Sequence, residues 1–201
     1  MKKLLSVFMI CGLLAASAVS CAGSSEDTAA DVPAAQEMTT EEVTAEDTAA
    51  FDKKAQEVAE DYMRAVVNDH SALKAAKVMF PEDIVLKSFT TEDIARSKLF
   101  DGLEMDNGVQ AGGFKVDKCE PLTQSQLMDA EAYYEKYANV ISGLPKIDYT
   151  VLDGREITLT TTLKGRDDSQ EYTSTFVVVD MGDEGCKLIT ATISKLEGLA
   201  D

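Results

Sequence analysis

The sequence predicts one α+β domain in residues 48–201, in which N-terminal helices pack on a curved antiparallel sheet ending in a three-stranded meander. In the first half of this region, apolar residues recur at three- and four-residue spacing, as in amphipathic helices. The second half instead has alternating segments rich in Thr and Ile, separated by turns that contain glycine. Helices that precede antiparallel strands indicate the α+β class.

Three helices are predicted before the first strand. The first covers Phe51–Val67, where the apolar spacing is clearest, and ends at Asn68. The second begins at Ser71, which is interpreted as its cap, and ends before Pro81 because proline cannot continue a helix. A third, short helix follows Thr91.

A loop and a strand lead to the clearest local signal in the chain. The loop is Gly102–Gly113, with its glycines as turn formers, and the alternating strand is Phe114–Cys119. Thr123 and Gln126 then have the spacing of a capping box, in which each side chain bonds the backbone of the other residue. We expect the helix that they start to run to about Ile141.

The C-terminal part is predicted to be all strand and turn. The segment Asp153-Gly154 is either a two-residue hairpin or a bulge at the irregular start of one long strand, and the shortness of the preceding strand favours the second. The predicted strands are Ile147–Leu152, Glu156–Leu163, Gln170–Asp180 and Cys186–Leu196.

The first 20 residues have the layout of a secretory signal, with two lysines, an apolar run and then small residues. The run Ala18-Val19-Ser20-Cys21 resembles the lipobox of bacterial lipoproteins, although leucine is more usual at the first of these positions. The resemblance implies cleavage before Cys21, a lipid on its sulfur, and an extracytoplasmic place at the cell membrane or outer membrane. Two or more acyl chains would anchor such a protein stably.

An acidic segment follows the proposed lipid site. Residues 22–47 contain eight acidic residues, no basic residue and few large apolar ones, so we expect a disordered tether. The whole chain has 19 basic and 36 acidic residues, a net charge of -17. Nucleic acid is therefore excluded as a partner, because a strongly acidic chain is repelled by phosphate backbones.

The predicted order of elements resembles the cystatin-like, nuclear transport factor two-like superfamily, which includes small lipoproteins. This resemblance covers residues 48–201 as an order of elements and implies a cone with a pocket between helices and sheet. Four aromatic residues are expected to line that pocket: Tyr62, Phe89, Tyr149 and Tyr172. It implies no catalytic residue, because the superfamily has no shared catalytic signature.

Candidate chemical groups are few. His70 is the only histidine, so a site with several histidine ligands is excluded, and no metal or other cofactor is predicted. Ser71 and Lys74 match the S-x-x-K pattern of penicillin-binding proteins, but the companion motifs are missing. Cys119 and Cys186 are either joined in a disulfide or two buried free thiols, since strand adjacency cannot be read from sequence.

Two functions are compatible with these features. The first is a lipid-anchored binding module for a small ligand or an envelope protein, and this is the preferred interpretation. The alternative is a small pocket enzyme, of isomerase or dehydratase type, which would use a buried carboxylate with a raised pKa. No catalytic residue is assigned from the sequence.

Overall fold

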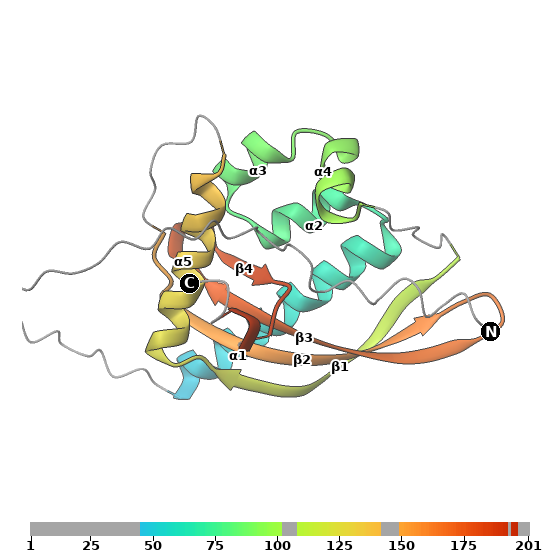
Figure 1. Cartoon of the computed structure of the whole chain (residues 1–201). Helices are drawn as coiled ribbons and strands as arrows, with labels where there is room; N and C mark the ends of the chain where they lie inside the picture. Colours follow the sequence, from blue (N-terminus) through green and yellow to red (C-terminus); the bar gives the residue numbers. More distant parts are fainter. Residues whose placement is uncertain (1–44, 102–107, 142–148, 193, 197–201) are drawn as a thin grey trace, which may run out of the picture.

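The computed structural model describes residues 45–101, 108–141, 149–192 and 194–196. Helices precede a four-stranded antiparallel sheet of order β1-β2-β3-β4 (Figure 1). The predicted α+β class and the final three-stranded meander are therefore confirmed. Across the described residues, no helix combines the length and the apolar character needed to cross a bilayer. The predicted signal segment and most of the predicted tether lie outside these residues.

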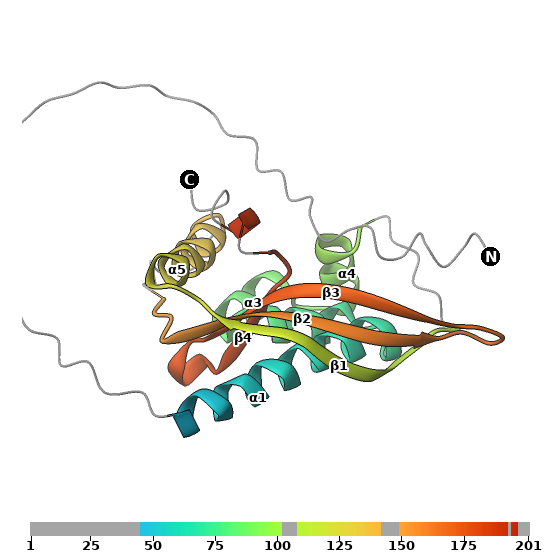
Figure 2. The same cartoon turned by 90° about the horizontal axis from the view of Figure 1, so that it is seen from below.

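The longest helix, α1 (Ala45–Met63), lies across one face of the sheet and contacts all four strands (Figure 2). It begins three residues before the predicted domain boundary and continues as a π-helix, η2 (Arg64–Asn68). The helical segment thus ends at residue 68, as predicted. The apolar stripe of α1 is the face that packs on the sheet, and its buried positions are Phe51, Ala55, Ala59, Tyr62 and Met63.

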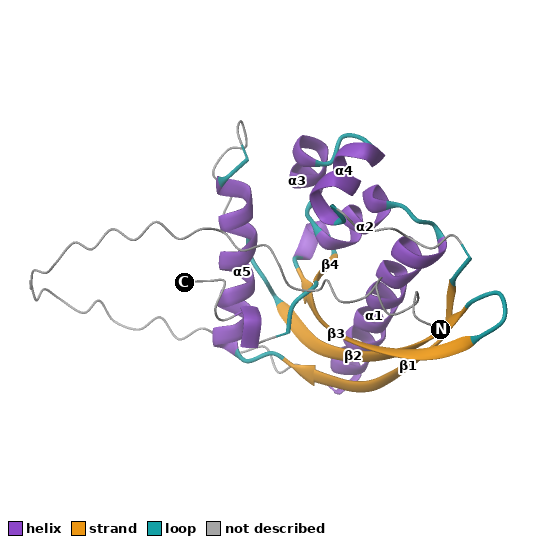
Figure 3. Ribbon diagram, turned by 45° about the vertical axis from the view of Figure 1, so that its right-hand side comes forward, coloured by secondary structure: helices purple, strands orange, loops and turns teal. Residues whose placement is uncertain are grey.

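Three short helices follow and form a layer over α1. In Figure 3, α3 and α4 lie farthest from the sheet, with α2 beneath them. The hydroxyl of Ser71 accepts a hydrogen bond from the Lys74 N–H at 3.2 Å, and that of Thr91 accepts one from the Ile94 N–H at 3.3 Å. Both predicted helix starts are therefore confirmed. The bounds are α2 (Ala72–Met79), α3 (Glu82–Ser88) and α4 (Glu92–Leu99).

Helix α3 is absent from the sequence-based prediction, which has no element between Pro81 and Thr91. Pro81 ends α2 but also starts α3, because its φ of −52° suits the first turn of a helix. Glu82 and Asp83 then place negative charge at the helix N-terminus, where it is favourable. With 7 residues, the helix is too short for its apolar spacing to be distinguished from a loop.

The sheet has three long strands and one short one. Strands β2 and β3 pair without interruption, from Asp153 opposite Asp180 to Lys164 opposite Ser169. The prediction of a strand up to Leu196 is wrong beyond Ile189, because residues 194–196 form a helical turn in which Leu196 is fully buried. The bounds are β1 (Gln110–Pro121), β2 (Asp153–Lys164), β3 (Ser169–Asp180) and β4 (Cys186–Ile189).

Two glycine-containing segments differ from a simple turn. Gly112 and Gly113 lie inside β1, at a register shift against β2, and not in the predicted loop. Gly113 has a φ of 58°, and a Cβ there would lie 2.9 Å from Thr162 Oγ1, so glycine is required at this irregularity. Asp153-Gly154 is the start of β2, so the two-residue hairpin is wrong. The predicted strand Ile147–Leu152 is also wrong over residues 149–152, which are not strand, and its first two residues lie outside the described residues.

Helix α5 (Gln124–Asn139) connects β1 to β2 and stands at one end of the sheet (Figure 3). The predicted capping box is confirmed: Thr123 and Gln126 exchange hydrogen bonds between side chain and backbone. Leu122 and Leu127 pack directly on the backbone of Gly154 in β2. A Cβ at Gly154 would lie only 2.6 Å from the Leu122 side chain and 3.0 Å from the Leu127 side chain. Gly154 therefore allows helix and strand to approach closely.

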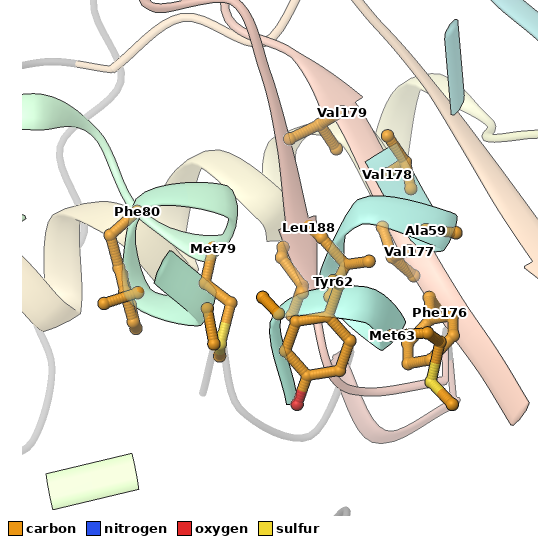
Figure 4. Close-up of a cluster of buried hydrophobic side chains, with 14 of the residues drawn as sticks. Ala59, Tyr62, Met63, Met79, Phe80, Phe176, Val177, Val178, Val179 and Leu188 are labelled. Atoms are coloured by element: carbon orange, nitrogen blue, oxygen red, sulfur yellow. The ribbon is translucent and has the colours of Figure 1, made fainter. Parts of the chain in front are cut away.

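The main core lies between α1, α2 and the sheet. Tyr62 of α1 and Phe176 of β3 are in edge-to-face contact, with 5.5 Å between ring centroids. Figure 4 shows these two rings near Leu188 of β4, with Met79 of α2 further along. The fully buried strand residues include Val177, so β3 is covered on both faces at this end.

A buried arginine closes one end of this core. Arg155 of β2 is 3% exposed and donates to Asp52 Oδ1 and Asp153 Oδ1, each at 2.6 Å, and to the Gly154 carbonyl at 2.8 Å. Its guanidinium also lies 4.8 Å from the Phe51 ring centroid. Because Asp52 and Phe51 belong to α1, this ion cluster fixes the helix to the sheet.

Candidate functional site

The four aromatic residues predicted to line a pocket lie in different elements. Tyr62 is in α1, Phe89 ends α3, Tyr149 precedes β2 and Tyr172 is in β3. The exposed fractions of the first three are 7%, 1% and 7%, and Tyr172 is half-buried. Tyr62, Phe89 and Tyr149 therefore belong to the core and offer little surface to a ligand.

All three residues belong to one hydrophobic core, in which each has different neighbours. Phe89 stacks on Phe80 at 5.2 Å, and Tyr137 of α5 covers Phe80 at 4.5 Å. The Tyr149 hydroxyl donates to Asp83 Oδ2 at 2.9 Å. Burial, followed by this hydrogen bond, raises the pKa of Tyr149. The rings of Phe80, Phe89 and Tyr137 therefore pack together between α5 and the ends of α2 and α3.

The two domain cysteines are free and unsuited to reaction. Cys119 is in β1 and Cys186 in β4, with β2 and β3 between them, so they are not bonded to each other. Burial, followed by the charge of Asp52, raises the pKa of Cys119. Burial, followed by the charge of Asp180, raises the pKa of Cys186. Both thiols therefore stay protonated near neutral pH, which disfavours nucleophilic chemistry.

The serine and lysine of the S-x-x-K pattern are held in structural contacts. Ser71 Oγ donates to Glu92 Oε2 at 2.9 Å while it caps α2. Lys74 Nζ lies 2.9 Å from Asp69 Oδ2 and is exposed. Ser71 is therefore a helix cap, and its hydroxyl is held in a hydrogen bond to the Glu92 carboxylate.

Glu92 is bound to the N-terminus of α2. The Ala72 N–H donates to its Oε1 at 2.6 Å and the Leu73 N–H to its Oε2 at 3.0 Å. Burial pushes the pKa of Glu92 up, but the hydrogen bonds and the charge of Arg96 outweigh it, so the pKa is lowered. A carboxyl group held ionised is the opposite of the raised pKa that the alternative enzyme would need.

The backbone is most unusual at His70, which connects η2 to α2. Its φ of 48° is the one positive value among the non-glycine residues that the structure describes. This left-handed conformation costs about 1–2 kcal/mol for a residue with a Cβ. The preceding residues, Arg64–Asn68, form a π-helix. This kind of helix is rare in proteins, and where it occurs it is often at a functional site.

Hydrogen bonds from distant segments hold this strained connection in place. The Asn68 side chain makes two of them with the backbone of Ala111 in β1, at 2.6 Å and 3.1 Å. Arg96 of α4 donates to the His70 carbonyl at 2.8 Å. These contacts tie the η2–α2 connection to β1 and α4, and Glu92 of α4 also binds the start of α2. We call Asn68, His70, Glu92 and Arg96 the His70 junction.

The His70 imidazole is the group at this junction that can accept a partner. Its Nδ1 is buried and has no hydrogen-bond partner among the described residues, although the side chain as a whole is half-exposed. A buried unpaired polar atom costs free energy, which a bound group can recover by supplying the missing hydrogen bond. From the sequence, His70 is only a lone loop residue, since nothing local signals its φ or its unpaired nitrogen.

In the described parts of the chain, no group of three or more His, Cys, Asp or Glu side chains is arranged to hold a metal ion. No family model, curated protein or solved structure matches the chain. The site is therefore interpreted from its own geometry, in which a strained, incompletely bonded histidine at the surface is the most unusual feature.

Replacing His70 by glycine is expected to raise the free energy of unfolding by about 0.5–1 kcal/mol. Glycine adopts a φ near 48° without strain, and its own entropic cost offsets part of this gain. The measurement is urea denaturation of both proteins. His70→Ala keeps the strain and is the matched control, for which no gain is expected. A His70→Gly protein less stable than His70→Ala would contradict the strained backbone.

Proposed function

We propose that the chain is an extracytoplasmic lipoprotein, attached to a membrane through lipid on Cys21, whose α+β domain is a binding module. The observation that carries the proposal is the position of Cys21, directly after an apolar run and the small-residue segment Ala18-Val19-Ser20. In this proposal residues 1–20 are removed and Cys21 becomes the first residue of the mature protein.

The segment after Cys21 supports an anchored domain. Residues 22–44 connect Cys21 to the first helix and contain six acidic residues and no basic one. A chain of this length and composition spans about 30 Å as a coil and can hold the domain near a bilayer without inserting into it. The same acidity continues to exclude nucleic acid as a partner.

Several contacts favour binding over catalysis. Three of the four predicted pocket residues are packed in the core, Ser71 is a helix cap, and Glu92 has a lowered pKa. At the His70 junction, by contrast, an unpaired Nδ1 and a strained backbone are kept at a half-exposed position. We propose that this junction contacts the partner, either an envelope protein or a small ligand. The enzyme alternative has no such support from a specific group.

The anchor is tested by replacing Cys21 with serine in the full chain. We expect this protein to lose metabolic labelling with palmitate and to move from the membrane fraction to the soluble one, because serine lacks the sulfur that carries the lipid. The measurements are labelling and cell fractionation.

The other cysteines supply matched controls. Cys11→Ser changes a residue that leaves with the signal, and Cys119→Ser changes one that stays in the domain. Both proteins are expected to be labelled and membrane-bound like the unmodified chain. Labelling that persists in Cys21→Ser, or disappears in Cys119→Ser, would show that Cys21 is not the lipid site.

A further inference from the structure

The layer of helices α2, α3 and α4 differs in charge from the rest of the chain. Residues 72–99 contain five basic and four acidic residues, whereas the whole chain has 19 and 36. Figures 1 and 3 place α3 and α4 at the outer side of this layer, away from the sheet. The layer as a whole is thus nearly neutral in a strongly acidic chain, although α3 and α4 by themselves contain three basic and four acidic residues.

The positive charges of this layer are gathered where the three helices end. Lys77, Lys87 and Lys98 lie in the last turns of α2, α3 and α4. These ends meet, because Phe80 after α2 stacks on Phe89 after α3, and Lys98 Nζ lies 5.6 Å from the Phe89 ring centroid. The helix dipole favours a lysine at the C-terminal end of each helix. It does not explain why the C-terminal ends of three helices lie together.

The acidic residues of the layer lie in the first turns of α3 and α4, and the first turn of α3 directly follows the end of α2. Glu82 and Asp93 lie in the first turns of α3 and α4. Asp83 accepts hydrogen bonds from the Tyr149 hydroxyl and the Ile84 N–H, and Glu92 holds the start of α2. None of the three lysines forms an ion pair within the described residues, and all three are exposed. Their charge therefore remains available to a partner.

Exposed aliphatic side chains accompany these lysines. Leu86 precedes Lys87 in α3 and is 63% exposed. Ile94 lies one turn before Lys98 on α4 and is 39% exposed. Large aliphatic side chains beside exposed lysines are the combination with which helices bind the interface of an anionic bilayer. We call Lys77, Leu86, Lys87, Ile94 and Lys98 the cationic face.

We propose that the cationic face docks on the surface of an anionic lipid bilayer. The lysines would contact lipid phosphates, and Leu86 and Ile94 would enter the boundary between headgroups and acyl chains. The acidic remainder of the domain is repelled by the same surface, so this face turns toward it. The proposal rests on the proposed function, because a lipid on Cys21 keeps the domain within reach of the bilayer.

The test uses the mature chain from residue 21 with Cys21→Ser, so that no lipid contributes to binding. Vesicles of phosphatidylglycerol and phosphatidylcholine in equal parts are compared with vesicles of phosphatidylcholine alone, by co-sedimentation at low and high salt. We expect binding to the mixed vesicles at low salt, and weak binding to the neutral ones. The triple variant Lys77→Gln, Lys87→Gln, Lys98→Gln is expected to bind at least tenfold more weakly, since each lysine contributes roughly fivefold.

A second triple variant with the same change in net charge is the control: Lys53→Gln, Lys115→Gln, Lys164→Gln. These lysines are exposed and lie on α1, β1 and β2, so binding is expected to stay within about twofold of the parent. Leu86→Ser should weaken binding several-fold, whereas Met128→Ser, at a residue of α5 that is 59% exposed, should not. Circular dichroism checks that each variant is folded.

Three results would overturn the proposal: no preference for the mixed vesicles, equal losses in the two triple variants, or unchanged binding in the first of them. These results are independent of the anchor, which is tested in cells by Cys21→Ser. If the vesicle test fails while Cys21 is shown to carry the lipid, only the bilayer-docking proposal fails. If vesicle binding is found but Cys21 carries no lipid, only the proposed anchor fails.

Discussion

Replacing Arg155 by alanine is expected to lower the free energy of unfolding by about 2–3 kcal/mol. Arg155 is 3% exposed, and its guanidinium is the shared donor for Asp52 and Asp153. Removing it leaves two carboxylates facing each other without a counter-charge, beside the uncovered Phe51 ring. The side chains of Asp52 and Asp153 are 42% and 40% exposed, so water reduces the loss below that of a fully buried pair.

Two variants separate this effect from a general loss of charge. Arg155→Lys keeps the charge but loses the planar fork that reaches both carboxylates, and an intermediate loss is expected. Lys53→Ala removes a lysine whose side chain is 79% exposed and should change stability by less than about 0.5 kcal/mol. The measurement is urea denaturation at neutral pH. If Arg155→Ala were as stable as Lys53→Ala, the ion cluster would not hold α1 on the sheet.

Replacing Phe176 by alanine is expected to lower the free energy of unfolding by about 3–5 kcal/mol, which is more than the loss expected for Arg155→Ala. Phe176 is 1% exposed and lies at the centre of β3, opposite Ile157 of β2. Its ring supports Tyr62 of α1 at 5.5 Å, so its removal leaves a cavity where helix and sheet meet (Figure 4). A loss of this size is a large fraction of the stability of a domain of ordinary size.

Thermal and urea denaturation would measure this loss. Phe176→Leu is expected to cost less than Phe176→Ala, because it leaves a smaller cavity. Met128→Ala truncates a side chain that is 59% exposed and should have almost no effect. Equal stability of Phe176→Ala and Met128→Ala would contradict the position of Phe176 in the core.

Local sequence signals were sufficient for most of the helices. The hydroxyl caps Ser71 and Thr91 and the capping box at Thr123 act within one helical turn, so their effect does not depend on the rest of the fold. Helix α3 was not predicted because it has only 7 residues and follows a proline that was interpreted as a stop. The last strand is predicted to run to Leu196, but β4 ends at Ile189. The sequence does not show this end, because a buried apolar residue such as Leu196 suits a helical turn as well as a strand.

The candidate site could not be predicted to the same extent. The four aromatic residues chosen for the pocket are large and apolar, and such residues are as suited to filling a core as to lining a cavity. Three of them fill the core. His70 is recognised as the only histidine, but local sequence does not indicate its left-handed backbone or its unpaired nitrogen. The segment around it is held by residues distant in sequence, since Asn68 bonds Ala111 and Arg96 bonds the His70 carbonyl.

Four properties of this protein can be predicted from its sequence: the α+β class, the order of most elements, the helix caps and the excess of acidic residues. These properties follow from local spacing and composition, which act between near neighbours. The fold is needed to see that β2 and β3 separate Cys119 from Cys186, and that the ends of α2, α3 and α4 meet at Phe80 and Phe89. Strand order and helix packing depend on contacts between segments far apart in the chain, and no local pattern specifies them.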